Sequence, residues 1–182
     1  MQVEIIRSKR KTICIQIRDG RPIVRAPLRA SNREINIFLQ KNEEWIRRHL
    51  AKAQARAQEM AAQPKLTEEE KRALADEARR VIPERAAYYA PLIGVTYGKI
   101  TIRGQHTRWG SCSAKGNLNF NYLLMLTPPE VLDSVVVHEL CHRKEMNHSD
   151  RFYREVLRVF PEYKKWNRWL KENGPGLMAR IA

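Results

Sequence analysis

Alternating hydrophobic and polar residues predict β-structure at the start of the chain. Apolar side chains recur at every second position over residues 13–17, and Val3 and Ile5 have the same spacing, which is typical of strands with one buried face. The dipeptide Asp19-Gly20 favours a two-residue hairpin turn, and another apolar run follows over residues 22–27. We therefore expect an N-terminal β-meander.

The hydrophobic period changes after Ser31, where apolar residues begin to recur every three or four positions. This spacing predicts one long helix over residues 32–60, with Ser31 as its N-cap. A further helix is predicted after a capping box formed by Thr67 and Glu70. Pro83 falls within that helix, and we expect it to kink or interrupt the helix because proline lacks a backbone N–H.

The second half of the chain predicts two short strands and three helices. Residues 99–103 and 117–124 have the alternation of strands. An apolar helix is expected from Pro128 onward, since proline is favoured in the first turn of a helix. Two amphipathic helices follow, one over residues 150–160 and a last one that we expect to end at the glycines and proline of residues 172–176.

This order of elements predicts an α+β fold. The strands and the long basic helix of residues 1–64 precede a core of residues 65–182, in which a small β-sheet packs against the apolar helix. At 182 residues the chain is long enough to bury a sizeable core, and we expect the two segments to form one compact unit overall.

Composition places the chain among ordinary globular proteins, with 30% charged and 43% hydrophobic residues. No apolar run approaches the length of a membrane span or an export signal, so we expect no membrane association. The three cysteines, Cys14, Cys112 and Cys141, are widely spaced and contain no C-x-x-C pair. They are typical of reduced thiols, and we expect a cytoplasmic protein of unspecified oligomeric state.

The net charge of +14 indicates attraction to polyanions. Residues 1–64 contain 14 basic and 6 acidic side chains, and so contribute +8 of this charge. A nucleic acid or nucleotide is therefore a candidate partner of the basic surface. The alternative is that the charges form solvated helix faces, and the basic residues are not interleaved with aromatic ones as in single-strand binding surfaces.

Candidate chemistry is concentrated in the sequence His138-Glu139-Leu140-Cys141-His142. Histidines four residues apart project from one face of a helix, so both imidazoles can reach one metal ion. Glu139 stands next to the first histidine, where its carboxylate can take a proton from an attacking water without occupying the metal. The pattern indicates a zinc site, because imidazoles suit Zn2+ and magnesium prefers oxygen ligands.

A catalytic zinc site needs a third protein ligand, and the residues leave His148, Glu145 and Cys141 as candidates. His148 is out of reach if the helix continues, at roughly 15 Å along the axis from His138. The helix must therefore end first. Asn147 is suited to stop it, and Ser149 or Asp150 can cap a new helix that begins near Arg151.

Several motifs together resemble the YgjP-like metallopeptidase family. They are Arg108-Trp109-Gly110-Ser111-Cys112-Ser113, Asn117-Leu118-Asn119, the stretch around His138 and His142, and Asn147-His148-Ser149 with Phe152. This family is similar to the wider group of minimal zincins that includes SprT and WLM-type proteases. The resemblance implies a zincin-like α+β core, zinc ligands at His138, His142 and His148, and Glu139 as general base.

The resemblance also directs attention to a strand beside the metal helix. In zincins such a strand forms the rim of the cleft and pairs with an extended peptide, and the strand over residues 117–124 is the candidate. The alternative is that its asparagines face solvent. Arg108, Asn119 and Tyr122 are the candidate substrate-binding residues, and Arg108, His106 or Tyr122 can supply the donor that stabilises an oxyanion.

The expected function is zinc-dependent hydrolysis of peptide bonds in a peptide or protein substrate. One alternative is a metal-dependent nucleoside triphosphate pyrophosphatase acting on UTP, an activity also attributed to YgjP-like proteins. Three histidines and the lack of a glycine-rich phosphate loop count against it. A weaker alternative is a module that binds nucleic acid and has a structural metal.

Overall fold

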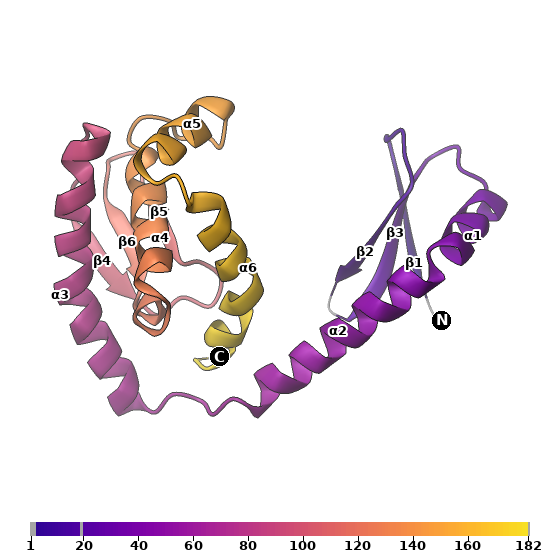
Figure 1. Ribbon diagram of the computed structural model, residues 1–182, viewed down its shortest axis with the longest axis horizontal. Helices are drawn as coiled ribbons and strands as arrows, with labels where there is room; N and C mark the ends of the chain where they lie inside the picture. The colour runs from indigo at the N-terminus through magenta and orange to yellow at the C-terminus, as the bar shows by residue number, and fades with distance from the viewer. Residues whose placement is uncertain (1–2, 19, 182) are drawn as a thin grey trace. The chain divides into compact units, whose positions relative to one another are not determined.

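The computed structural model describes residues 3–18 and 20–181 of the chain (Figure 1). It contains two compact units, Met1–Ala62 and Gln63–Ala182. Both combine helices with a three-stranded sheet, so the expected α+β class is confirmed. Among the described residues, no helix has both the length and the apolar character needed to cross a membrane.

The sheet of the first unit contains β1 (Glu4–Ser8), β2 (Cys14–Arg18) and β3 (Arg21–Pro27) in the order β1-β3-β2. β3 pairs with β1 in parallel and with β2 in antiparallel orientation, so the expected meander is wrong. The central strand is β3, which pairs with a neighbour along each of its edges. It contains the fully buried residues Val24 and Ala26. The hairpin between β2 and β3 has Gly20 at φ +70°, and Asp19 lies outside the described residues.

Two helices, α1 (Asn32–Lys41) and α2 (Glu43–Ala62), replace the single helix expected over residues 32–60. Ser31 and Glu34 form a capping box at the start of α1. The break comes at Asn42, whose side-chain amide donates to the Phe38 carbonyl at 2.7 Å. An asparagine that satisfies the last carbonyls of a helix with its own side chain ends that helix locally.

The second unit begins with α3 (Glu68–Ile93), and its predicted capping box between Thr67 and Glu70 is confirmed. The helix continues through Pro83, so the expected interruption is wrong. Ile82 and Ala86, on either side of the proline, are fully buried. Tertiary packing of this face therefore outweighs the hydrogen bond that Pro83 cannot donate.

The sheet of the second unit contains β4 (Ile100–Arg103), β5 (Gly110–Cys112) and β6 (Leu118–Asn121) in the order β4-β6-β5. β6 ends at Asn121, earlier than the strand expected over residues 117–124, and a 3₁₀ helix, η1 (Tyr122–Leu126), follows. The reason is the buried Asn121 side chain. Its oxygen accepts from the Leu123 N–H at 3.1 Å, and its amide donates to the carbonyls of Gln105 and Arg108.

The centre of the second unit is α4 (Pro129–Cys141), which packs against α3, β5, α5 (Asp150–Val159) and α6 (Tyr163–Ala179). Figure 1 shows α4 between α3 and α6. The buried Asp133 of α4 forms an ion pair with Arg85 of α3 and accepts from Tyr89, which fixes the two helices together. α6 continues past residues 172–176, so its predicted end there is wrong.

Candidate metal centre

The last turn of α4 positions the first two histidines. His138 and His142 lie one turn apart with ring centroids 4.9 Å from each other. Ten residues of the helix are buried, and most of these are apolar. Burial among apolar side chains fixes the helix axis, and with it the direction of both imidazoles.

The chain turns back immediately after this pair. α4 ends at Cys141 with His142 as its C-cap, earlier than the stop expected at Asn147. The N–H groups of Lys144 and Glu145 both donate to the Cys141 carbonyl, which closes a tight turn. Of the two predicted caps, Ser149 and Asp150, Ser149 caps α5 by accepting from the Phe152 N–H.

This turn brings His148 to the other two histidines. The ligand nitrogens of His138, His142 and His148 all lie within 4.8 Å of one another. The Nε2 atoms of His138 and His148 are 3.0 Å apart. The side chains of Cys141 and Glu145 do not join this group among the residues that the structure describes; Cys141 is fully buried in the hydrophobic core.

Neighbouring groups fix the orientation of the rings. His142 Nδ1 lies 3.0 Å from the Glu145 carbonyl. A carbonyl only accepts, so Nδ1 carries the proton and Nε2 is left with a lone pair. His138 Nδ1 lies 2.8 Å from the Tyr163 hydroxyl, which leaves its Nε2 facing His148. The Phe152 ring contacts all three imidazoles, with centroid distances between 4.6 and 4.9 Å.

The electrostatics favour neutral imidazoles at His138 and His142. Burial, followed by repulsion from His142 and His148, lowers the pKa of His138 to about 3. Burial also lowers the pKa of His142. Two nitrogens that share a tetrahedral zinc ion at about 2.0–2.1 Å lie roughly 3.3 Å apart, close to the 3.0 Å between His138 and His148. Neutral, converging nitrogens therefore fit a zinc ion.

Glu139 lies beside the histidines and is only 5% exposed. Burial raises the pKa of its carboxyl to about 8, so the group can take and return a proton near neutral pH. The strand β5 leaves room for it at Gly110. A Cβ built at Gly110 would lie 2.7 Å from both Cγ and Oε1 of Glu139. This position needs glycine because of space, not because of backbone conformation.

A cavity of about 210 Å³ contains His138 and Glu139. Residues 107–110 line one part of it, and the other part is lined by α4 and by Tyr163, Asn167 and Leu170 of α6. The exposed Arg108 is thus the one candidate substrate-binding residue that the structure brings to Glu139. Asn119 and Tyr122 are absent from the described lining of this cavity.

The register of the sheet explains the position of Asn119. Gly110 is opposite Phe120, and Ser111 is opposite Asn119. Because Gly110 faces Glu139, its neighbours Ser111 and Asn119 face the other side of the sheet, where Asn119 donates to the Ser111 hydroxyl at 3.2 Å. Tyr122 packs on Gly104, where a Cβ would be 2.7 Å from its hydroxyl oxygen. His106 is exposed and lines a neighbouring groove.

The predicted rim strand requires a correction. β6 is the central strand and pairs with β4 on one edge and β5 on the other, so its main chain has no edge to offer a peptide. β5 lies next to α4 and pairs, within the described part of the chain, with β6 alone. The edge beside Glu139 therefore belongs to β5. Local alternation predicts that a strand exists but not its place in the sheet.

Sequence reasoning missed Tyr163 and Gly110 as parts of the site. Tyr163 lies on the buried face of α6 at 5% exposure. Its hydroxyl reaches His138 across 25 residues of sequence, and no local pattern indicates such a contact. In the sequence, Gly110 stands only as a member of the motif of residues 108–113, and the structure places it in β5 beside Glu139.

Crystal structures of two metallopeptidase zymogens are similar to the chain: abylysin of Pyrococcus abyssi at 26% identity and jannalysin of Methanocaldococcus jannaschii at 21%. They cover 50% and 52% of this chain and 93% and 97% of their own, each with a TM-score of 0.46. A search of functionally curated proteins finds no match. The model of the YgjP-like metallopeptidase domain matches residues 11–74 and 57–173, and the chain therefore belongs to the YgjP-like metallopeptidase family.

Proposed function

We propose that the chain is a zinc-dependent peptidase in which His138, His142 and His148 hold the metal and Glu139 is the general base. The observation that carries the proposal is the convergence of three imidazoles within 4.8 Å beside a buried carboxyl group. A zinc ion bound by three imidazoles acts as a Lewis acid that makes water nucleophilic near neutral pH.

The side chains of the cavity have separate roles in this proposal. Glu139 takes a proton from the attacking water and returns it to the leaving amine. Tyr163 orients His138 through the 2.8 Å contact to Nδ1. Arg108 lines the same cavity and, as a permanent cation, is our candidate for stabilising the negative charge that develops on the carbonyl oxygen.

The substrate in this proposal is an extended peptide. The open edge of β5 begins at the cavity, which Gly110 lines, and main-chain hydrogen bonds to such an edge align a peptide whatever its side chains are. The UTP pyrophosphatase alternative receives no support from the donor set, since a site for phosphates and magnesium is built from oxygen ligands. It is therefore retained only as a control reaction.

The test compares zinc-loaded wild-type protein with Glu139→Gln. Unfolded casein and UTP are the two substrates, and peptide release and pyrophosphate release are both followed. We expect casein cleavage by the wild type and a loss of at least about 100-fold in the variant, with one zinc ion per chain retained in both by elemental analysis.

Glu130→Gln is the matched control, because Glu130 is an exposed carboxylate in the first turn of the same helix. We expect it to cleave casein like the wild type. Cleavage that persists in Glu139→Gln would refute the assignment of the general base. Release of pyrophosphate in place of peptides would refute the peptidase proposal itself.

A further inference from the structure

A second, larger cavity opens beside the cavity that contains Glu139. Its volume is about 660 Å³, within the range of roughly 300–1,000 Å³ typical of ligand pockets. The two cavities share Thr107, Trp109, Asn167 and Leu170 as lining residues. We call the larger one the side groove. Because the same side chains line both, the two cavities are neighbours, and a peptide that extends from the Glu139 cavity past these side chains reaches the side groove.

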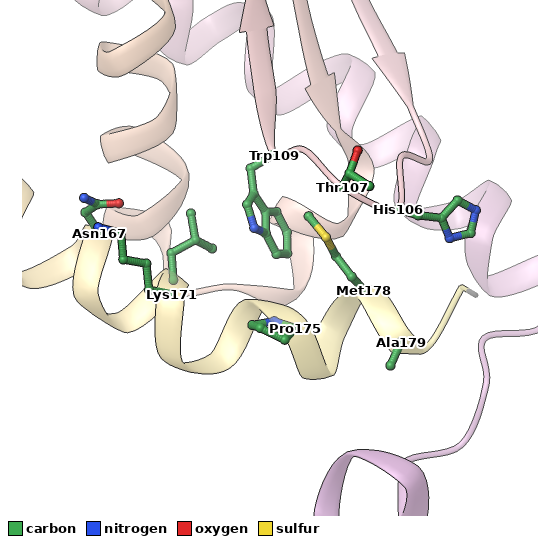
Figure 2. A pocket seen from close by; sticks show the side chains of 9 residues that line it. His106, Thr107, Trp109, Asn167, Lys171, Pro175, Met178 and Ala179 are labelled. Carbon is green, nitrogen blue, oxygen red and sulfur yellow. The ribbon is translucent and has the colours of Figure 1, made fainter. Parts of the chain in front are cut away.

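The side groove lies between residues 106–109 and one face of α6. The lining residues Asn167, Lys171, Pro175 and Met178 follow one another at intervals of three or four residues, so they share a face of the helix. Figure 2 shows Met178 extending from α6 toward Trp109, with Pro175 beside them and His106 farther along the loop. The groove thus has two walls from separate parts of the chain.

Trp109 lies directly on the backbone of α6. A Cβ at Gly174 would be 3.0 Å from Cζ2 and 3.1 Å from Nε1 of the indole, so a larger residue would displace the ring. Glycine and proline are the residues least suited to a helix interior, yet Gly174 and Pro175 both lie inside α6. The side groove gives both residues a role there. Gly174 leaves space for the Trp109 indole, and Pro175 contributes an apolar ring to the lining.

The lining chemistry defines the kind of group that fits. Trp109, Leu170, Pro175 and Met178 provide apolar surface. Figure 2 shows Asn167 on one side of Trp109 and Met178, and His106 on the other. No carboxylate is among the described lining residues, and Lys171 adds a positive charge. Such a groove favours a large apolar side chain and disfavours lysine or arginine.

We propose that the side groove binds a bulky apolar side chain of the peptide substrate, such as Phe, Leu or Met, at one fixed position relative to the cleaved bond. The inference rests on the proposed peptidase function, because the groove lies beside the Glu139 cavity and would receive a side chain of a peptide bound there. It makes Trp109 and Met178 residues that determine specificity.

Binding and cleavage are measured separately. Zinc-loaded Glu139→Gln protein is titrated with fluorescein-labelled peptides of Ala, Ser and Gly that differ only in one central residue, Phe, Leu, Ala or Lys. We expect the Phe peptide to bind at least about tenfold more tightly than the Ala peptide, since burial of an aromatic side chain is worth that much. Mass spectrometry of casein fragments from the wild type should show apolar residues enriched at one position.

Two substitutions fill the groove from opposite walls. Met178→Trp acts from α6, and Thr107→Trp acts from an exposed loop position that does not depend on folding of the helix. Each should reduce the ratio of Phe to Ala affinity to near one. Glu172→Trp is the matched control, because this exposed residue of α6 does not line the groove, and it should leave the ratio unchanged.

The outcomes separate this inference from the function on which it rests. Casein cleavage without any side-chain preference, or equal affinity for the Phe and Ala peptides, would overturn the inference and leave the peptidase proposal standing. Absence of cleavage in the wild type would overturn both. Concentration-dependent dimerisation that Met178→Trp abolishes would assign the groove to a second copy of the chain and also overturn it.

Discussion

Single contacts with the histidine group determine how well it can hold a metal ion. Tyr163 is the clearest example, since its hydroxyl lies 2.8 Å from His138 Nδ1 while the residue is 5% exposed. Burial raises the pKa of this phenol, so the group stays protonated and neutral at physiological pH. A neutral hydroxyl can hold the imidazole in one tautomer and one orientation without adding charge to the site.

Tyr163→Phe should weaken zinc binding by about 10- to 100-fold, the usual effect of removing a partner of a metal-bound histidine. The measurement is competition between the protein and a fluorescent zinc chelator. Tyr153→Phe is a suitable control, because the Tyr153 ring stacks beside His148 and the substitution keeps the ring. Equal zinc affinity of wild type and Tyr163→Phe would show that the contact does not orient His138.

Gly110→Ala should lower the rate of peptide cleavage by about tenfold or more. The added methyl group would lie 2.7 Å from Glu139 Cγ, so the carboxyl must move, and small displacements of a catalytic group are costly. The measurement is kcat/KM on casein-derived peptides. Ser111→Ala, one residue along the same strand and on its other face, should have little effect. A Gly110→Ala enzyme with wild-type kcat/KM would contradict this placement of Glu139.

At the scale of elements, an ion-pair cluster fastens α5 to the turn that follows α4. Glu155 lies between Lys144 and Arg158, with its side chain 19% exposed. Hydrogen bonding by Arg158, and then by Lys144, lowers the pKa of Glu155 to about 2. The cluster bridges the segment that carries His148, so it supports the position of the third histidine.

The lowered pKa predicts a pH-dependent stability. The folded state favours ionised Glu155, so this contribution is present above the ordinary carboxyl pKa of 4.5 and is lost as pH falls toward about 2. Glu155→Gln should therefore reduce the free energy of unfolding near neutral pH by at most about 3 kcal/mol. The difference in the free energy of unfolding between the wild type and Glu155→Gln should become smaller below pH 4.5.

Urea unfolding at a series of pH values measures this effect. Glu162→Gln, in an exposed ion pair with Lys165, is the comparison. If the loss of unfolding free energy in Glu155→Gln stays constant from neutral pH down to pH 2, the ion pair is not the source of that loss.

The elements that the sequence predicts well are those with local signals. The N-cap at Ser31 and the capping box at Thr67 both depend on residues within one turn of each other. The spacing of His138 and His142 is likewise local. Strand order, the continuation of α6 through Pro175 and the contact of Tyr163 with His138 depend on packing between distant segments. Local patterns do not contain that information.

At the scale of the whole molecule, positive charge is unevenly distributed. The first unit has 14 basic and 6 acidic side chains, a net charge of +8, and the second has 20 and 14, a net charge of +6. The first unit is half the length of the second, so its charge density is higher. Arg21 and Arg25 are exposed and share one face of β3.

This distribution predicts salt-dependent binding to a polyanion. A fluorescent DNA duplex of random sequence should bind the protein, and log K should fall linearly with log salt concentration. Combined substitution of Arg21 and Arg25 by Gln should reduce the slope by up to about 2. The same change at the exposed Arg72 and Arg80 of α3 is the control. Equal slopes for both double variants would show that the field of the whole chain, and not of the first unit, governs binding.

The glycine and proline residues inside α6 have a consequence for the local stability of that helix. Relative to alanine, glycine costs about 1 kcal/mol and proline about 3 kcal/mol in a helix interior, and Gly174, Pro175 and Gly176 follow one another. The last third of α6, beyond Asn173, therefore depends on tertiary contacts, which include Trp109 against Gly174 and the hydrogen bonds of Arg180 with Pro64 and Leu66. We expect this segment to open at a lower free energy than the first turns of the helix. Hydrogen exchange should then be faster at the amides beyond Asn173 than in the first turns, which contain Tyr163.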